Sequence, residues 1–298
     1  MDLYGLCVIL WCVGGTILTY RREEDMKIIN LVEDTTIGDC LNEHGLSFYI
    51  ETEKHKLLVD SGATDMFLHN ADILGVDLTQ VDTFVLSHGH YDHAGGLTAF
   101  AKINPNAKIY LKDSVGGDYY HLLPECEKYI GIDKEILQLP QIIKVKENVQ
   151  IDDELFLFSN FNRKRYPAWS NQELKQKIGN TYIQDDFAHE QCLVISQGKQ
   201  RILMSGCAHN GILSILDKYL ELLGAYPDTV ISGFHMMKKS DYTEEEVDYI
   251  RQTARELMKT KALFYTGHCT GQKAFAIMKE MMGEQLQEFH SGSELEMK

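Results

Sequence analysis

The sequence lacks the marks of a disulfide-bonded or nucleic-acid-binding protein. Its 298 residues include seven cysteines, an odd number with no Cys-x-x-Cys pair, so neither a disulfide framework nor a cysteine-rich structural zinc site is indicated. Basic residues are scarce: 29 Lys and Arg face 44 Asp and Glu, and the formal net charge of −15 argues against binding to nucleic-acid phosphates. We therefore expect a protein of the reducing cytoplasm without a nucleic-acid partner.

Residues 1–25 differ from the rest of the chain. Residues 3–20 carry no charged side chain and are apolar enough for a membrane span of marginal length. No Lys or Arg precedes this run, which makes it a poor secretory signal. As an anchor it would be followed by Arg21 and Arg22, which would keep the next domain cytoplasmic. The alternative is an upstream extension of a domain that starts at residue 26, and membrane contact is expected only from an anchor.

Short apolar runs alternate with helical patterns over residues 26–298, which favours a single α/β domain. Strands are expected at residues 26–32, 46–50, 56–59, 81–86, 107–111, 142–145, 149–151, 155–159, 192–196, 201–205, 229–234 and 262–265. Helices are expected at residues 64–74, 97–103 and 212–223, and another after Thr243, which has capping-box spacing to Glu246. Residues 113–128 are expected to form loop and helix, and residues 160–177 a polar, basic loop.

The segment 87–97 holds three imidazoles and a carboxylate within six consecutive residues, directly behind an expected strand. Side chains two positions apart in extended chain point the same way, so His88, His90 and Asp92 can converge on one point. His93 would then face a neighbouring point. This density of ligand-type residues predicts two adjacent cation sites.

A site for two cations needs ligands from elsewhere in the fold, and two later strands end in histidine. The strand at 201–205 leads into Gly-Cys-Ala-His209, and the strand at 262–265 leads into Thr-Gly-His268. Both place a histidine where a strand exits toward the expected site. We therefore expect His209 and His268 to be the fifth and sixth ligands.

The His-x-His-x-Asp-His pattern of residues 88–93 resembles the signature of the metallo-β-lactamase superfamily, and the resemblance covers the chain from about residue 26 onward. It implies a four-layer αβ/βα sandwich with a metal site at the strand ends. It also implies that Asp60 supports the metal-binding loop; the other interpretation of Asp60 is a turn or a helix N-cap before residues 64–74, and both roles can hold. Superfamily hydrolases usually carry a bridging aspartate where Cys207 stands, so Cys207 is either a thiolate ligand or a free buried cysteine.

The same resemblance bears on three further positions. His189 occupies the usual place of the third superfamily histidine and competes with His209, which we favour. His235 ends the strand at 229–234 and resembles a proton-donating histidine of related phosphodiesterases, so we expect a general acid or substrate contact, with a structural role as the alternative. Arg163 and Arg165 lie where related proteins carry a loop over the site; they are candidates for binding a substrate phosphate or carboxylate, or belong to a solvated loop.

Histidine-rich ligation with a carboxylate favours two divalent cations, Zn²⁺ first and Fe or Mn as alternatives. The resemblance implies hydrolysis rather than oxygen reduction, because the di-iron branch of the superfamily usually has glutamate where this chain has His90. We expect a metal-activated hydroxide, oriented by Asp92, to attack a small phosphoester, lactone or amide.

The paired Gly-Cys-Ala-His and His-Cys-Thr-Gly sequences resemble one branch of the superfamily, the archaeal dihydropterin synthase-like enzymes of methanopterin assembly. That branch implies an alternative function, a transferase that joins a dihydropterin methyl diphosphate to an aryl amine and releases diphosphate. A non-catalytic metal-binding protein is the third hypothesis. The sequence indicates no particular oligomeric state.

Overall fold

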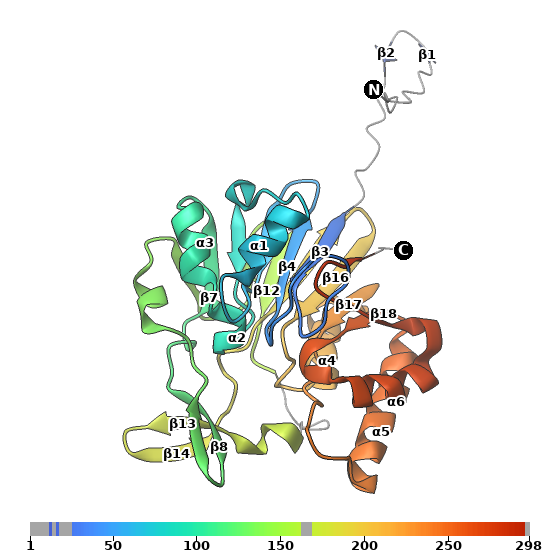
Figure 1. Cartoon of the computed structure of the whole chain (residues 1–298). Helices are drawn as coiled ribbons and strands as arrows, with labels where there is room; N and C mark the ends of the chain where they lie inside the picture. Colours follow the sequence, from blue (N-terminus) through green and yellow to red (C-terminus); the bar gives the residue numbers. More distant parts are fainter. Residues whose placement is uncertain (1–11, 14–15, 18–25, 162–168, 296–298) are drawn as a thin grey trace.

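The computed structural model describes residues 12–13, 16–17, 26–161 and 169–295, and its two seven-stranded sheets pack face to face with helices on both outer faces (Figure 1). Side chains from both sheets, among them Phe48 and Leu193, form the apolar layer between them. Phe100 belongs to the layer outside the first sheet and Leu257 to the layer outside the second. This arrangement confirms the expected α/β class and four-layer sandwich.

The first sheet has the strand order β10-β7-β6-β5-β4-β3-β20. These strands are β3 (Lys27–Val32), β4 (Ser47–Glu51), β5 (Lys56–Val59), β6 (Thr83–Val85), β7 (Lys108–Lys112), β10 (Ile142–Val145) and β20 (Glu294–Leu295). Its helices are α1 (Met66–Ile73), α2 (Tyr91–Ala94) and α3 (Leu97–Ile103), with 3-10 turns η1 (Leu78–Gln80) and η2 (Lys134–Gln138). Strands β5, β6 and β7 are parallel, so the chain leaves β6 toward His88 at the edge where their carboxyl ends meet.

The second sheet has the strand order β11-β12-β15-β16-β17-β18-β19. These strands are β11 (Val149–Gln150), β12 (Leu155–Phe158), β15 (Cys192–Gln197), β16 (Gln200–Ser205), β17 (Thr229–Ser232), β18 (Leu263–Thr266) and β19 (Leu286–Glu288). Its helices are α4 (Ile212–Leu223), α5 (Glu244–Thr260) and α6 (Gln272–Met282), with 3-10 turns η4 (His268–Thr270) and η5 (Gly283–Gln285). Strands β16, β17 and β18 are parallel, so the loops that follow them leave the same edge of the sheet. The predicted capping box of Thr243 and Glu246 at α5 is confirmed.

A third, four-stranded sheet projects from the sandwich, and its presence corrects two expectations. Its strand order is β14-β13-β8-β9, with β8 (Tyr119–Leu123), β9 (Cys126–Tyr129), β13 (Leu174–Ile178) and β14 (Thr181–Gln184), and the 3-10 turn η3 (Trp169–Glu173) precedes β13. The expected helix within 113–128 is therefore wrong, and the expected loop at 160–177 ends in a 3-10 turn and a strand. The two tyrosines of β8 favour strand, and Pro124 in the tight turn to β9 cannot continue a helix.

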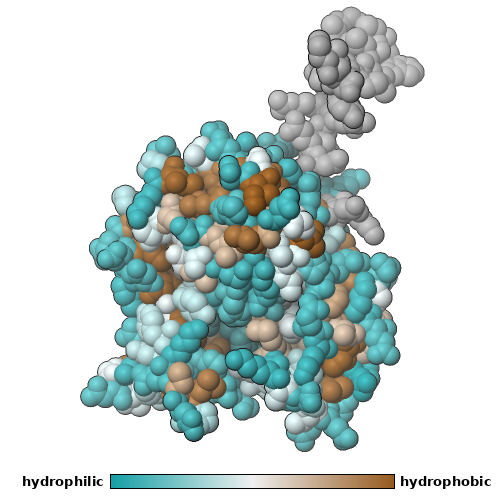
Figure 2. All heavy atoms as spheres, in the orientation of Figure 1, coloured by the Kyte–Doolittle hydropathy of each residue, from teal (hydrophilic) through white to brown (hydrophobic). Residues whose placement is uncertain are grey.

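Whether residues 3–20 form a membrane anchor or an upstream extension stays a prediction. Most of that stretch lies outside them, and its described pieces are the paired strands β1 (Cys12–Val13) and β2 (Thr16–Ile17). Within the described ranges, no helix combines the length and the apolar character needed to cross a membrane. Figure 2 shows a face of the domain on which hydrophilic residues predominate, with scattered hydrophobic patches between them, as the acidic composition leads one to expect.

His55 ties the two halves of the sandwich together. It lies in the turn between β4 and β5, and its Nδ1 is 2.8 Å from Asp82, just before β6 of the first sheet. Its Nε2 is 2.5 Å from Asp152, which follows β11 of the second sheet. Burial opposes the charge on His55, but the hydrogen bonds to the two carboxylates outweigh burial and raise its pKa above 6.5.

We predict that His55→Gln removes a pH-dependent part of the stability. A raised folded-state pKa stabilises the fold fully below the unfolded pKa, and the contribution is lost as pH rises through the folded pKa. The free energy of unfolding should fall by about 1 kcal/mol at pH 5.5, after allowance for partial exposure, and by much less at pH 9. Denaturant unfolding at both pH values checks this, with exposed His69→Gln on α1 as control. An equal loss of unfolding free energy at both pH values would contradict a stabilising role for protonated His55 between the two carboxylates.

Candidate metal centre

The expected ligands from three separate segments meet at the edge where the two sheets open. The residues after β6 supply His88, His90, Asp92 and His93, and the loops after β16 and β18 supply His209 and His268. All six side chains are buried. Their ligand-type atoms fall into two adjacent groups.

The first group is His88, His90 and His209, whose ligand atoms lie within 4.8 Å of one another. His88 Nε2 and His90 Nδ1 are 3.1 Å apart. The ring of His209 lies 4.8 Å from both other rings, and its Nε2 is buried with no hydrogen-bond partner among the described residues. An orphaned imidazole nitrogen beside two others is the arrangement that a cation would complete.

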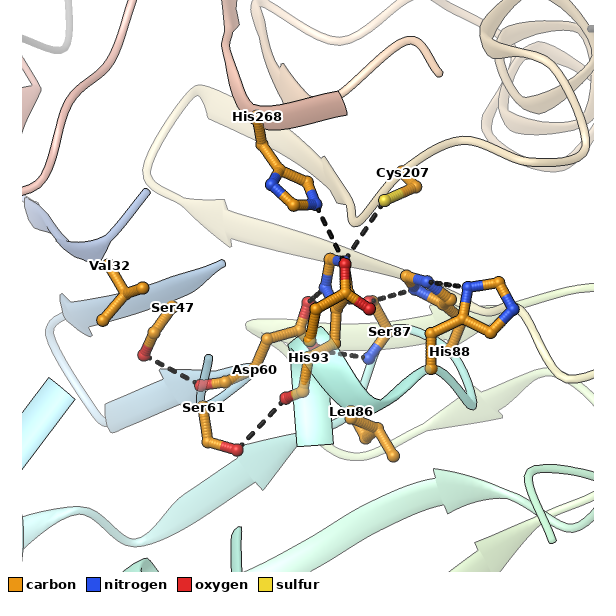
Figure 3. Close-up of polar contacts among 12 residues, drawn as sticks. Val32, Ser47, Asp60, Ser61, Leu86, Ser87, His88, His93, Cys207 and His268 are labelled. Carbon is orange, nitrogen blue, oxygen red and sulfur yellow. Dashed lines mark hydrogen bonds and ion pairs between the residues drawn. The ribbon is translucent and has the colours of Figure 1, made fainter. Parts of the chain in front are cut away.

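The second group surrounds His93. Asp92 Oδ2 lies 3.7 Å from His93 Nε2 and 3.4 Å from His268 Nε2. Cys207 Sγ lies 3.2 Å from His93 Nε2, and Figure 3 shows Cys207 and His268 approaching His93 from the loops of the second sheet. This group offers a carboxylate, two imidazoles and a thiol within reach of one centre.

The grouping of Asp92 differs from the expectation. Extended chain was expected to place it with His88 and His90, but residues Tyr91–Ala94 form the short helix α2. His90 is still extended, whereas each residue after it turns by about 100° instead of alternating. Asp92 therefore lies beside His93 and His268.

Asp60 holds the first motif in place. Its carboxylate accepts hydrogen bonds from the backbone N–H of Ser87, from the Ser87 hydroxyl and from His93 Nδ1, each at 2.7 Å. The N-cap interpretation of Asp60 is wrong, because α1 begins at Met66 with Asp65 at the cap position. The contacts match the supporting role that the superfamily resemblance implies.

Two buried glutamates that the sequence did not single out hold the other ligand loops. Glu190 accepts from the backbone N–H of His209 at 2.7 Å and from that of Asn210 at 2.9 Å. Glu33 accepts from the backbone N–H of His268 at 2.5 Å. His268 adopts a left-handed φ of 47°, a strained conformation for which such contacts compensate. No spacing rule distinguishes these glutamates from surface acids near a strand end.

Further oxygen acceptors orient the imidazoles. Asn171 Oδ1 lies 3.1 Å from Nδ1 of His209, and Asp34 Oδ1 lies 2.6 Å from Nδ1 of His268. With Nδ1 bonded in this way, Nε2 of the neutral His209 ring carries the lone pair, and Nε2 of His268 would carry one once that ring has lost its second proton. Asn171 and Asp34 were also missed, because they come from segments with no motif of their own.

The arrangement supports His209 over His189 for the first group. Both ring nitrogens of His189 have partners: Nδ1 accepts from the backbone N–H of Gly89 at 3.0 Å, and Nε2 lies 3.2 Å from Asp185. Those bonds leave His189 beside His90 as a support for the motif loop. His209, by contrast, has its Nε2 unpartnered among the described residues.

Burial and mutual repulsion keep most of the imidazoles neutral. Burial, with neighbouring histidines, lowers the pKa of His88 and His209 well below 6.5 and that of His90 to about 3. His268 is the exception: burial opposes its charge, but the Asp34 and Asp92 carboxylates raise its pKa well above 6.5. Burial would raise the pKa of Asp92, yet His93 and His268 lower it below its usual range. Neutral imidazoles and an ionised carboxylate are the ligand forms that a divalent cation needs, so the first group fits a cation as it stands, and the second group fits one once His268 gives up its second proton.

A cavity of about 820 Å³ opens above these groups. His90, Asp92, Cys207, His209, His235 and His268 line its inner end. His235 has a left-handed φ of 48°, and its Nδ1 lies 2.7 Å from the Ser170 hydroxyl. Its ring lies 4.2 Å from that of His209, so the structure places it beside the first group. Arg163 and Arg165 lie outside the described residues.

Comparisons with known proteins agree with this geometry. Residues 42–167 match the model of the metallo-beta-lactamase superfamily. The chain is 27% identical to the 7,8-dihydropterin-6-methyl-4-(beta-D-ribofuranosyl)-aminobenzene-5'-phosphate synthase of Methanocaldococcus jannaschii, over 93% of this chain and 98% of that protein. It is 28% identical to an uncharacterized protein of the same archaeon, over 84% of this chain and 93% of that protein. The predicted branch resemblance is thus confirmed.

Comparison with solved structures also finds proteins of the metallo-β-lactamase fold. The chain resembles Tm1679, described as a metal-dependent hydrolase of the beta-lactamase superfamily, with a TM-score of 0.78 and 28% identity over 92% of this chain and 99% of that one. The metallo-beta-lactamase fold protein YhfI from Bacillus subtilis shares the fold at a TM-score of 0.53 and 14% identity, over 91% of this chain and 98% of that one. Together these findings show the metallo-β-lactamase fold and, over nearly the whole chain, similarity to enzymes of that superfamily.

Proposed function

We propose that the protein is a metal-dependent hydrolase of a small phosphoester, lactone or amide, acting with two divalent cations. The observation that carries the proposal is the pair of adjacent donor groups, one of three imidazoles and one of mixed donors, at the inner end of an open cavity. The imidazole and thiol donors favour Zn²⁺, with Fe or Mn as alternatives. Bound cations would supply a water deprotonated near neutral pH and would neutralise charge that develops on the attacked group.

Asp92 is suited to orient the attacking water. Its carboxylate is ionised and lies between His93 and His268, facing the cavity. Cys207, whose buried thiol lies 3.2 Å from His93 Nε2, lines the same cavity beside this carboxylate. The Asp92 carboxylate can thus accept a hydrogen bond from the attacking water and hold the proton that this water gives up.

His235 is suited to move a proton at the substrate side. Burial and the nearby His268 lower its pKa to about 3, so it is neutral near pH 7. The Ser170 hydroxyl donates to the His235 carbonyl and lies next to Nδ1, which leaves Nε2 as the proton acceptor. His235 can therefore act as a general acid only after it has taken up a proton during the reaction.

The transferase alternative has one specific observation in its favour. One M. jannaschii relative, which this chain matches over 98% of that protein's length, is named as a synthase of a dihydropterin aminobenzene phosphate compound. In that reaction the same cavity would hold a dihydropterin methyl diphosphate and an aryl amine, and diphosphate would leave. A non-catalytic role as a metal-binding protein is the third candidate.

We predict that purified, metal-loaded protein hydrolyses generic substrates without an acceptor. The assay offers bis(4-nitrophenyl) phosphate, a lactone series and, separately, dihydropterin methyl diphosphate with and without an aryl amine. Product release from the generic substrates, abolished by a chelator, supports hydrolysis. Diphosphate release that depends strictly on the amine, with no generic turnover, would replace the hydrolase proposal by the transferase. No turnover with bound metal retained would favour the non-catalytic role.

We predict that His90→Ala removes the cation of the first group. Elemental analysis should show bound metal falling from about two ions to about one per chain, and turnover should fall by at least about 100-fold, because a tetrahedral site loses one of its protein ligands. Circular dichroism should stay unchanged. His69→Ala on the exposed face of α1 serves as the matched control. Unchanged metal content in His90→Ala would remove His90 from the ligand set.

We predict that His235→Ala retains its metal and loses rate. General acid–base groups contribute about 10²- to 10⁴-fold, so kcat should fall by at least about 100-fold while elemental analysis gives the wild-type metal content. The kcat of Ser170→Ala should lie between those of the wild type and His235→Ala, because this substitution removes the hydrogen bond to the His235 ring but keeps the ring itself. Loss of metal in His235→Ala would instead place His235 among the ligands.

A further inference from the structure

The outer part of the cavity is lined by charged side chains that the proposed chemistry does not use. Lys128 comes from β9 of the projecting sheet, and Lys238 and Lys239 come from the loop after β17. The carboxylates that line this part are Glu173 and Glu246. Which of these charges are already neutralised decides what kind of ligand the outer cavity can take.

Three of the charged groups already have partners. Lys238 Nζ donates to both carboxylate oxygens of Glu246, at 2.8 and 2.7 Å, and lies 5.2 Å from the centre of the Trp169 ring. Glu173 lies 2.9 Å from Nε2 of His121. The acidic side chains of the outer cavity are therefore engaged with groups of the protein.

Lys128 is held over the metal-binding segment without a carboxylate partner among the described residues. Its Nζ donates to the Tyr91 hydroxyl at 2.8 Å and lies 4.4 Å from the centre of that ring. Tyr91 belongs to the first motif, and its backbone N–H donates to the carbonyl of Ile130 at 2.9 Å. These contacts hold the Lys128 ammonium group at the cavity wall. The backbone hydrogen bond at Ile130, two residues after Lys128, joins the same segment to the metal motif.

Lys239 supplies a second cation to the same cavity. It is exposed, it follows the paired Lys238, and within the described part of the chain it has no ion pair. Two unneutralised ammonium groups in one cavity are unexpected on a chain with a net charge of −15, which repels anions at long range. Over about 8 to 10 Å of screening length, however, the local charges dominate what the cavity binds.

We propose that Lys128 and Lys239 bind an anionic group, a carboxylate or a phosphate, on the part of the substrate that is not cleaved. A cavity of about 820 Å³ accommodates a whole small molecule, and the metal donors and these lysines line the same cavity, so a substrate whose reacting bond lies at the donors can reach the lysines with its other end. Trp169, with Lys238 against its ring, lines the same part and gives that distal portion an apolar neighbour. The inference deepens the proposed hydrolysis and rests on it for the position of the reacting bond.

The first test compares metal-loaded wild type with Lys128→Gln/Lys239→Gln on three 4-nitrophenyl hexanoate esters, one unmodified, one with an ω-carboxylate and one with an ω-phosphonate. The wild type should prefer the anionic esters in kcat/KM by about tenfold or more, and the double variant should lose that preference through KM. Lys175→Gln, on β13 of the same projecting sheet, is the control and should keep the preference. The carboxylate and phosphonate arms separate the two anion types.

The second test reads binding without turnover. Trp11 and Trp169 are the two tryptophans of the chain, so Trp11→Phe leaves Trp169 as the fluorescent reporter in the cavity. In this background 4-nitrobenzoate should quench the Trp169 fluorescence at lower concentration than 4-nitrobenzamide. The variant Lys128→Gln/Lys239→Gln should abolish this difference between the two probes. The variant Lys128→Arg/Lys239→Arg, which keeps both positive charges, should restore it. Equal binding of both probes, or a difference untouched by the double variant, would overturn the inference. Selective binding, together with no hydrolysis of these esters, of bis(4-nitrophenyl) phosphate or of the lactones, would sink the proposed function and leave this inference standing.

Discussion

The site depends on buried carboxylates that accept hydrogen bonds from the backbone of the ligand-bearing loops. Asp60 binds the segment that follows β6, Glu190 binds the loop of His209, and Glu33 binds the loop of His268. A buried carboxylate without such partners costs several kcal/mol, roughly, so each acid and its loop must form together. The loops and the buried acids therefore become ordered together, and the imidazoles that the loops carry take a set position.

This dependence joins the metal donors to the packing of the two sheets. Glu33 follows β3 of the first sheet yet holds the loop after β18 of the second. Glu190 holds the loop after β16 next to the first motif. The apolar layer between the sheets, where Phe48 is only 2% exposed, keeps these partners in register. Each such side chain contributes about 1.5–3 kcal/mol, so the layer can sustain the strained φ of Ala208 and His268.

The periodic part of the sequence predicted the strands and the α/β class well, whereas the four-layer sandwich was implied by the resemblance to the superfamily. The local part of the site was predicted nearly as well. Buried strands are continuous apolar runs, and the motif at 88–93 carries its ligands within one segment, so both can be read without tertiary information. The alternation rule failed at Asp92, because a helical turn replaces extended chain after His90. The projecting sheet was missed because its strands are short and mostly exposed, so they show no buried face. Supporting groups such as Glu190 had no local pattern at all.

Cys207 shows how the second donor group links protonation to ligand binding. Burial raises the pKa of its thiol well above 9.0, so without a neighbouring cation it is a neutral group beside His93. His268, in the same group, has a raised pKa and carries a proton between Asp34 and Asp92. A cation would have to displace both protons to use these donors, whereas the neutral imidazoles of the first group give up none. The first group should therefore fill at lower pH than the second, and the cysteine in place of an aspartate makes that difference larger.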